Sequence, residues 1–137
     1  MNDLVMAASG ATVLVIEDES IVAEIYRIAL GRAGYAVIVA RDGIEGLDKA
    51  STTSPDFIFL DIRMPGMDGI EVLRAMASNP ELKDVPVVML SNFDDPALVE
   101  ESMRLGAKQY VIKAGMNPAE LAGIVARWVP ASKERSS

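Results

Sequence analysis

Five short apolar runs recur along the chain, and each is followed by a segment with helical spacing. The runs are nearly continuous and several are β-branched, which is typical of parallel strands buried on both faces. They cover Thr12–Ile16, Ala36–Ala40, Phe57–Leu60, Val85–Leu90 and Gln109–Ile112. The alternation of strand and helix predicts an α/β fold, with a parallel sheet, right-handed crossovers and helices on both faces.

The intervening segments carry the start and stop signals of five helices. In the first, we expect one buried stripe that begins after Glu19 and ends before Gly34, since glycine readily takes the left-handed conformation at a helix end. The residues of this stripe are Ile21, Val22, Ile25, Ile28, Ala29 and Leu30. A polar capping residue precedes each of the other helices, in two cases followed by proline. These signals are Asp42, Asp68, Asp95-Pro96 and Asn117-Pro118.

The charge and the missing residue types exclude several classes of function. The chain has 13 basic and 20 acidic residues, a formal net charge of −7 and no Lys/Arg run, which speaks against nucleic-acid binding. It has no cysteine and no histidine, so disulfides, Ser-His-Asp triads and zinc sites built on these residues are excluded. No apolar run approaches the length of a membrane span. We therefore expect a cytoplasmic protein without membrane contact.

The 137 residues suffice for about one domain. We assign residues 11–130 to a single folded unit and residues 131–137 to a flexible polar tail. Residues 1–10 contain Asp3 and no basic residue, which makes them a poor signal peptide. We therefore expect a short N-terminal extension there.

Polar residues follow four of the five predicted strands at the point where each strand ends. Glu17 and Asp18 follow the first strand, Asp61 the third, Ser91 the fourth and Lys113 the fifth. Ligands of an open parallel sheet bind beyond the carboxyl ends of its strands. We therefore expect these side chains to meet at one edge of the sheet.

Such a set of groups suits the transfer of a phosphoryl group to a carboxylate. Two like charges about 4 Å apart repel by roughly 4 kcal/mol at an effective dielectric constant near 20, so clustered carboxylates need a cation. Mg²⁺ (or Mn²⁺) fits, with Asp18 as a direct ligand and Glu17 acting partly through water. Asp61 is the expected nucleophile, which forms an acyl phosphate. Lys113 would neutralise one phosphoryl oxygen as a point charge, and Ser91 would donate a hydrogen bond to another.

Four motifs carry a resemblance to a known family. They are VLVIEDE at 13–19, LDIRMPGMDG at 60–69, VMLS at 88–91 and GAKQYVIK at 106–113. The second is the most specific and the third is weak alone. On these motifs the chain resembles, over about residues 11–130, the receiver domain of bacterial two-component response regulators, of the stand-alone, chemotaxis-regulator-like kind.

The resemblance implies a flavodoxin-like, doubly wound sheet of five strands in the order 2-1-3-4-5, with five helices. It implies that Asp61 is the phosphoacceptor and that the metal is bound by Asp18, Asp61 and the backbone carbonyl of Arg63. It also implies that Ser91 and Tyr110 form a switch pair, in which the hydroxyl moves toward the phosphoryl group and the ring turns inward behind it. From the residues alone, Tyr110 indicates packing near a sheet edge.

Our interpretation is a phospho-accepting signalling domain of a phosphorelay, not an enzyme that turns over an external substrate. It would catalyse only its own phosphorylation and slow dephosphorylation. A histidine kinase or histidine phosphotransfer protein would donate the phosphoryl group. Output would be a contact with an unknown protein near Met103, Arg104 and Tyr110. We expect a monomer or weak dimer.

One position departs from the family pattern. Ala114 follows Lys113, where the family usually has proline. A cis bond to alanine would cost roughly 2.5–4 kcal/mol, whereas a cis bond to proline costs little. We therefore predict a trans Lys113–Ala114 bond and a reshaped loop before Pro118.

Two other interpretations stay open at this point. One is a binding module of the same fold that is never phosphorylated. The other is an aspartyl-phosphate hydrolase of haloacid-dehalogenase type, which needs a second aspartate two residues after the nucleophile, where this chain has Arg63. A dinucleotide site is disfavoured, because residues 17–20 contain no glycine.

Overall fold

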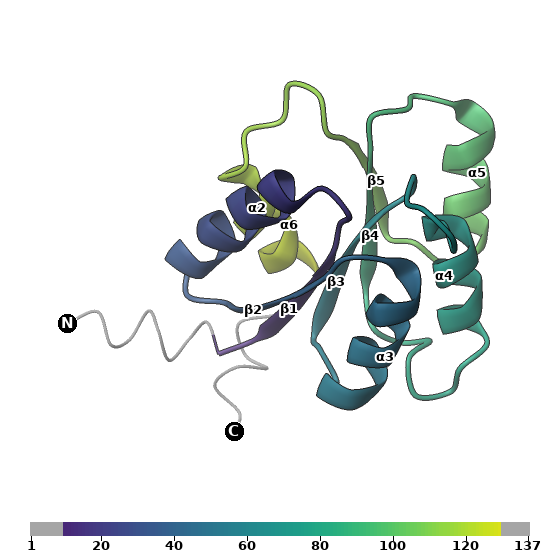
Figure 1. The fold of residues 1–137 in the computed structure, drawn as a ribbon, viewed down its shortest axis with the longest axis horizontal. Helices are drawn as coiled ribbons and strands as arrows, with labels where there is room; N and C mark the ends of the chain where they lie inside the picture. The colour runs from purple at the N-terminus through teal and green to yellow at the C-terminus, as the bar shows by residue number, and fades with distance from the viewer. Residues whose placement is uncertain (1–9, 130–137) are drawn as a thin grey trace.

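A sheet of five strands forms the centre of the computed structural model, which describes residues 10–129 (Figure 1). The strands are β1 (Thr12–Ile16), β2 (Ala36–Ala40), β3 (Phe57–Asp61), β4 (Val87–Ser91) and β5 (Gln109–Ile112). Neighbouring strands are parallel throughout, in the order β2-β1-β3-β4-β5. The predicted fold class and strand order are confirmed.

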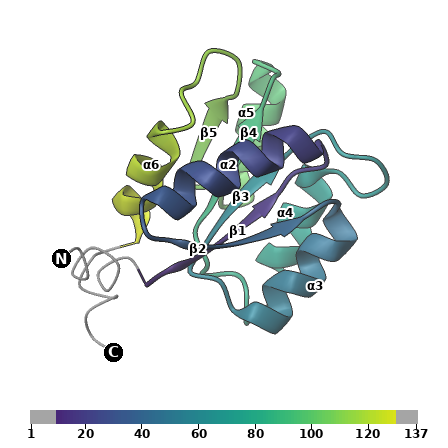
Figure 2. The same cartoon turned by 60° about the vertical axis from the view of Figure 1, so that its left-hand side comes forward.

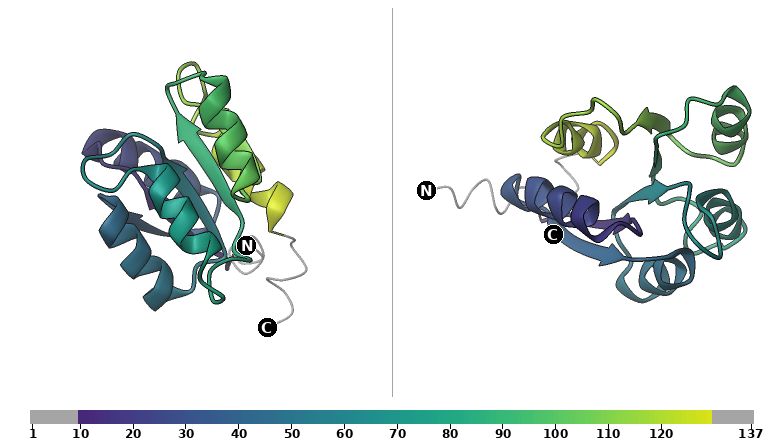
Figure 3. Two further views of the ribbon diagram at one scale, coloured as in Figure 1. Left: turned by 90° about the vertical axis from the view of Figure 1, so that its right-hand side faces the viewer. Right: turned by 45° about the horizontal axis from the view of Figure 1, so that its top comes forward.

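Four helices connect the strands and a fifth follows β5, and together they cover both faces of the sheet (Figures 2 and 3). They are α2 (Ser20–Arg32), α3 (Gly43–Thr53), α4 (Gly69–Ala77), α5 (Pro96–Arg104) and α6 (Glu120–Trp128). Helices α2 and α6 pack on one face of the sheet, and α3, α4 and α5 lie on the other. No helix within residues 10–129 is both long enough and apolar enough to cross a bilayer.

The two faces of the sheet build two apolar cores. Because successive side chains of a strand point to opposite faces, Leu14 and Ile16 of β1 pack toward α3 and α4, whereas Val13 and Val15 pack toward α2 and α6. All residues of the inner strands β3 and β4 are buried. This burial explains why these strands are continuous apolar runs rather than alternating ones.

The predicted buried stripe of the first helix is only partly right: Leu30 is buried and Val22 packs against the core, but the three isoleucines do not. The residues of α2 that are buried are Ala23, Tyr26 and Leu30. Its isoleucines face solvent instead, with 76% of Ile21 exposed and smaller fractions of Ile25 and Ile28. Alanine lets the helix approach the sheet closely, and a tyrosine ring can be buried as well as an aliphatic chain. The apolar residues of α2 lie on two faces of the helix, and hydropathy alone does not show which face packs against the sheet.

The boundaries differ from the prediction by a few residues. Strand β4 begins at Val87 rather than Val85, after a proline that cannot donate to a ladder. The last helix begins at Glu120, because the side chain of Asn117 caps a separate turn by accepting from the Ala119 N–H at 3.0 Å. The aspartate caps are confirmed, since Asp42, Asp68 and Asp95 each accept a hydrogen bond from a first-turn backbone N–H.

The predicted N-terminal extension, apart from Gly10, and the predicted tail at residues 131–137 lie outside the described residues. The domain bounds 11–130 therefore stay a prediction at both ends.

Candidate functional site

Five polar side chains meet at the carboxyl edge of the sheet, as the order of strands requires. Glu17 and Asp18 directly follow β1, Asp61 ends β3, Ser91 ends β4, and Lys113 directly follows β5. Strand β3 pairs with β1 and β4, and β4 pairs with β5. Residues as many as 96 positions apart in sequence are thus brought to one edge of the molecule, as predicted.

An ammonium group bridges two of the carboxylates. Lys113 Nζ lies 3.0 Å from Glu17 Oε1 and 3.3 Å from Asp61 Oδ1. The side chains of Glu17, Asp61 and Lys113 are 1%, 7% and 10% exposed, so the pairs are shielded from water. Exclusion of water strengthens both the attraction of the carboxylates to the ammonium and their repulsion of one another. The protonation of each group therefore depends on its distance from the others.

Burial and neighbouring charge raise the pKa of Asp61 to about 7. Desolvation is the largest cause, and the Glu17 carboxylate adds to it, while the Lys113 ammonium opposes both. Burial alone would lower the pKa of Lys113, but the carboxylates of Asp61 and Glu17 outweigh it and raise the pKa. Such competing effects on buried charges are typical of functional sites.

The donor atoms fit a hard divalent cation. One carboxylate oxygen from each of Glu17, Asp18 and Asp61 lies within 4.8 Å of the others. Lys113 supplies one positive charge for three carboxylates, and burial together with the Glu17 carboxylate raises the pKa of Asp61 despite it. Oxygen ligands at such spacing suit Mg²⁺ or Mn²⁺. The backbone carbonyl of Arg63 as a fourth ligand stays a prediction.

A small hollow of about 190 Å³ opens onto the carboxylates. Its lining includes Asp18, Asp61, Lys113, Arg63 and Phe93. The Arg63 guanidinium stacks over the Phe93 ring, with Cζ 4.4 Å from the ring centroid, a favourable cation–π contact. Arg63 and Phe93 thus form part of the wall of the hollow that contains Asp61.

Phe93 also joins the two residues of the predicted switch pair. Its backbone N–H donates to Ser91 Oγ at 2.9 Å, and its backbone carbonyl accepts from Tyr110 Oη at 2.7 Å. The resemblance to receiver domains implies that Ser91 and Tyr110 act as a pair, but it does not indicate this backbone bridge between them. No sequence signal identifies it, because any residue has the same backbone groups.

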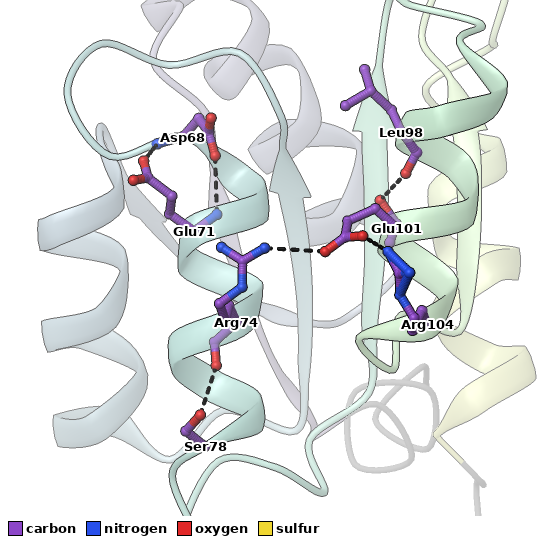
Figure 4. Close-up of polar contacts among 8 residues, drawn as sticks. Asp68, Glu71, Arg74, Ser78, Leu98, Glu101 and Arg104 are labelled. Carbon is purple, nitrogen blue, oxygen red and sulfur yellow. Dashed lines mark hydrogen bonds and ion pairs between the residues drawn. The ribbon is translucent and has the colours of Figure 1, made fainter.

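The bridge leads into the least buried helix of the fold. Ser102 is the only fully buried residue of α5, and its hydroxyl donates to the Leu98 carbonyl of the same helix. Glu101 links α5 to α4 by accepting from Arg74 Nη2 at 3.1 Å, and it also pairs with Arg104 (Figure 4). Exposed ion pairs of this kind contribute about 0–1 kcal/mol, so the polar contacts of Glu101 add little to the stability of α5.

The loop after β5 begins with the predicted trans bond, and its reshaping relative to the family stays a prediction. The Lys113–Ala114 bond is trans, and residues 10–129 contain no cis peptide bond. The Lys113 N–H donates to the Ser91 carbonyl at 2.8 Å, and the Lys113 carbonyl accepts from the Met116 N–H at 3.1 Å. Gly115 makes the turn possible with φ of +80°, a conformation that favours glycine.

Comparison with known proteins identifies a family. The family described as response regulator receiver domain matches residues 13–126. The transcriptional regulatory protein CseB of Streptomyces coelicolor is 36% identical over 88% of this chain, and the chain spans about half (48%) of its length. PilG of Pseudomonas aeruginosa is 33% identical over 90% of both chains. The chemotaxis protein CheY4 of Vibrio cholerae superimposes with a TM-score of 0.81 at 32% identity, over 87% of this chain and 98% of that one.

Proposed function

The chain belongs to the response regulator receiver domain family, and from this premise we propose that it accepts a phosphoryl group on Asp61 and signals through the change that follows. The observation that carries the proposal is the buried Asp61 carboxylate, held 3.3 Å from Lys113 Nζ and beside Glu17 and Asp18. The single ammonium of Lys113 is shared between Asp61 and Glu17, so it does not neutralise the acidic cluster. Asp61 also faces two further carboxylates and a hollow open to a donor.

The proposed donor is a phosphohistidine on another protein. An oxygen of ionised Asp61 attacks phosphorus, the phosphorus–nitrogen bond breaks, and its electron pair stays on the imidazole that leaves. The donor must be a separate chain or domain, because these 137 residues contain no histidine. A histidine kinase or a histidine phosphotransfer protein of the cytoplasm meets this requirement.

Each residue around Asp61 has a task in the transfer. Lys113 holds the Asp61 carboxylate in place and pairs with a phosphoryl oxygen when the group arrives. Asp18, Asp61 and the backbone carbonyl of Arg63 would hold Mg²⁺ or Mn²⁺, with Glu17 acting partly through water. When bound, the divalent ion neutralises charge on the transferred phosphoryl group.

The proposed output is a displacement of α5 and of the loop before it. The phosphoryl group carries about −1.5 to −2 charges, and the Ser91 hydroxyl would donate a hydrogen bond to it. Ser91 Oγ would then leave the Phe93 N–H, whose carbonyl holds Tyr110. The surface around Met103 and Arg104 would change and contact a protein partner.

The domain is a signalling module rather than a conventional enzyme. We propose that it catalyses only its own phosphorylation and slow dephosphorylation, within residues 11–130, as a monomer or weak dimer. CseB is named a transcriptional regulatory protein and CheY4 a chemotaxis protein. Because both outputs occur among similar proteins, we leave the output partner unassigned.

Mass spectrometry after incubation with acetyl phosphate and Mg²⁺ tests the proposal. Wild-type protein should gain the mass of one phosphoryl group, and the gain should disappear with a chelator and in the Asp61→Asn variant. If wild type and Asp61→Asn behave identically, the chain is a binding module of the same fold and the proposal is wrong.

A further inference from the structure

A second hollow adjoins the phosphoacceptor site on the side of α3. It measures about 430 Å³, and its wall includes Asp18, Arg41, Ile44, Pro65 and Met67. Asp18 is common to this hollow and to the one that opens onto Asp61. The two hollows therefore adjoin each other at Asp18.

The most exposed large apolar side chains lie at this edge. Among residues 10–129, Ile21 (76% exposed) and Ile44 (70% exposed) are the most exposed large apolar residues. Each is the second residue of its helix, α2 or α3, so both lie at the edge that carries Asp61. Single exposed apolar residues are ordinary, but two beside one polar site, one of them over a hollow, indicate a contact surface.

The walls of the second hollow are fixed before any partner arrives. Asp42 caps α3 by accepting from the Glu45 N–H at 2.8 Å, and Glu45 Oε1 accepts from the Arg41 N–H at 2.8 Å. A Cβ atom on Gly43 would lie 2.7 Å from the Met67 carbonyl oxygen, so the backbones of the two walls are in close contact there. A preformed wall loses little entropy when it binds.

Building on the proposed function, we propose that this hollow is a docking subsite for the protein phosphodonor, which inserts an apolar side chain against Ile44, Pro65 and Met67. The occupant is the phosphohistidine protein rather than another molecule, because the hollow shares Asp18 with the acceptor site. Small donors such as acetyl phosphate reach Asp61 through the first hollow and do not touch Ile44. Ile44 is thus a residue that selects the protein donor and takes no part in the chemistry.

Comparison of protein and small-molecule donors tests this subsite. The protein donor is the autophosphorylated catalytic core of whichever histidine kinase of the source genome labels wild type fastest. We expect Ile44→Ala and Ile44→Glu to lower kcat/KM for this donor about tenfold or more, as for a central apolar contact of an interface. Labelling by acetyl phosphate and Mg²⁺ should stay within twofold of wild type. Ser51→Glu, at an exposed site on the same helix, adds the same charge away from the hollow and should change neither rate.

The outcomes separate the two proposals. Equal transfer from the kinase to wild type and to both Ile44 variants would overturn the subsite and leave phosphorylation of Asp61 intact. Slowing by Ile44→Glu but not by Ile44→Ala would also overturn it, since repulsion near the metal would then explain the effect. If light scattering shows a dimer that Ile44→Ala dissociates without slowing transfer, the hollow binds a second copy instead. Failure of wild type to react with acetyl phosphate would refute the proposed function itself.

Discussion

Removal of the Asp61 charge should stabilise the metal-free protein, although Asp61 is the centre of the proposed site. The pKa of this carboxyl rises from 3.8 to about 7 on folding, mainly through burial and then through Glu17. Because the folded state disfavours the ionised carboxylate, the fold is most stable while Asp61 is protonated. This stability is lost as the pH rises from 3.8 to about 7. The full effect is about 4 kcal/mol at 1.36 kcal/mol per pH unit of pKa change.

The expected gap between Asp61→Asn and wild type therefore depends on pH. Asparagine resembles the protonated carboxyl, so the variant should be more stable than wild type by about 4 kcal/mol at pH 8, and the gap should shrink by about 3 kcal/mol at pH 5. Urea unfolding at both pH values, with chelator present, measures it. Saturating Mg²⁺ at pH 8 should narrow the gap, because the cation binds the ionised site of wild type more tightly.

A matched control isolates the buried charge. Asp48→Asn removes the same charge from an exposed position on α3, and exposed substitutions change stability within about 0.5 kcal/mol. A gap for Asp61→Asn that is equal at pH 5 and pH 8, or a variant less stable than wild type at pH 8, would refute the raised pKa and the unfavourable clustering of carboxylates.

Three further changes test other parts of the site. Lys113→Gln should lower the free energy of unfolding at pH 8 by at least about 2 kcal/mol, because it leaves buried carboxylates without their cation, and Mg²⁺ should restore part of the loss in urea unfolding. Tyr110→Phe removes the hydrogen bond to the Phe93 carbonyl and should cost about 1 kcal/mol while hydrogen exchange in the loop before α5 accelerates. Gly69→Ala places a Cβ atom 2.3 Å from the Asp61 carbonyl oxygen, so we expect a loss of about 2 kcal/mol or more in thermal unfolding, together with slower acetyl phosphate labelling.

Each of these has a contrary result. Unchanged stability of Lys113→Gln without metal would mean that the ion pairs with Asp61 and Glu17 contribute nothing. Unchanged exchange in Tyr110→Phe would mean that the backbone bridge does not hold the loop. Wild-type stability of Gly69→Ala would contradict the close approach to β3, and Gly123→Ala, which meets no atom within 4 Å, is the comparison for an unhindered glycine.

The sheet and the site were predictable because both depend on patterns that are visible in the amino-acid sequence. Continuous apolar runs such as Phe57–Leu60 are buried on both faces, and strand ends of a parallel sheet meet at one edge. The positions of Asp61 and Lys113 at strand ends therefore sufficed to bring them together. The aspartate caps were predictable for the same reason, since a cap acts within three residues of itself.

The buried face of α2 and the role of Phe93 were not predictable in this way. Apolar residues lie on two faces of α2, and packing against the sheet selects Ala23 and Tyr26 over Ile21, a choice that depends on tertiary fit. Phe93 acts through its backbone groups, which carry no side-chain signature. The hollow beside Ile44 is lined by three segments distant in sequence, and no local sequence pattern predicts such a shape.

The chemical identity of the phosphorylated residue tests the central claim most directly. Borohydride reduces an aspartyl phosphate to homoserine, so trapping after incubation with acetyl phosphate and Mg²⁺, followed by peptide sequencing, locates the acyl phosphate. We predict homoserine at position 61 and at no other position. Homoserine at position 18, a stable phosphoester on Ser91, or no trapped residue would contradict the account.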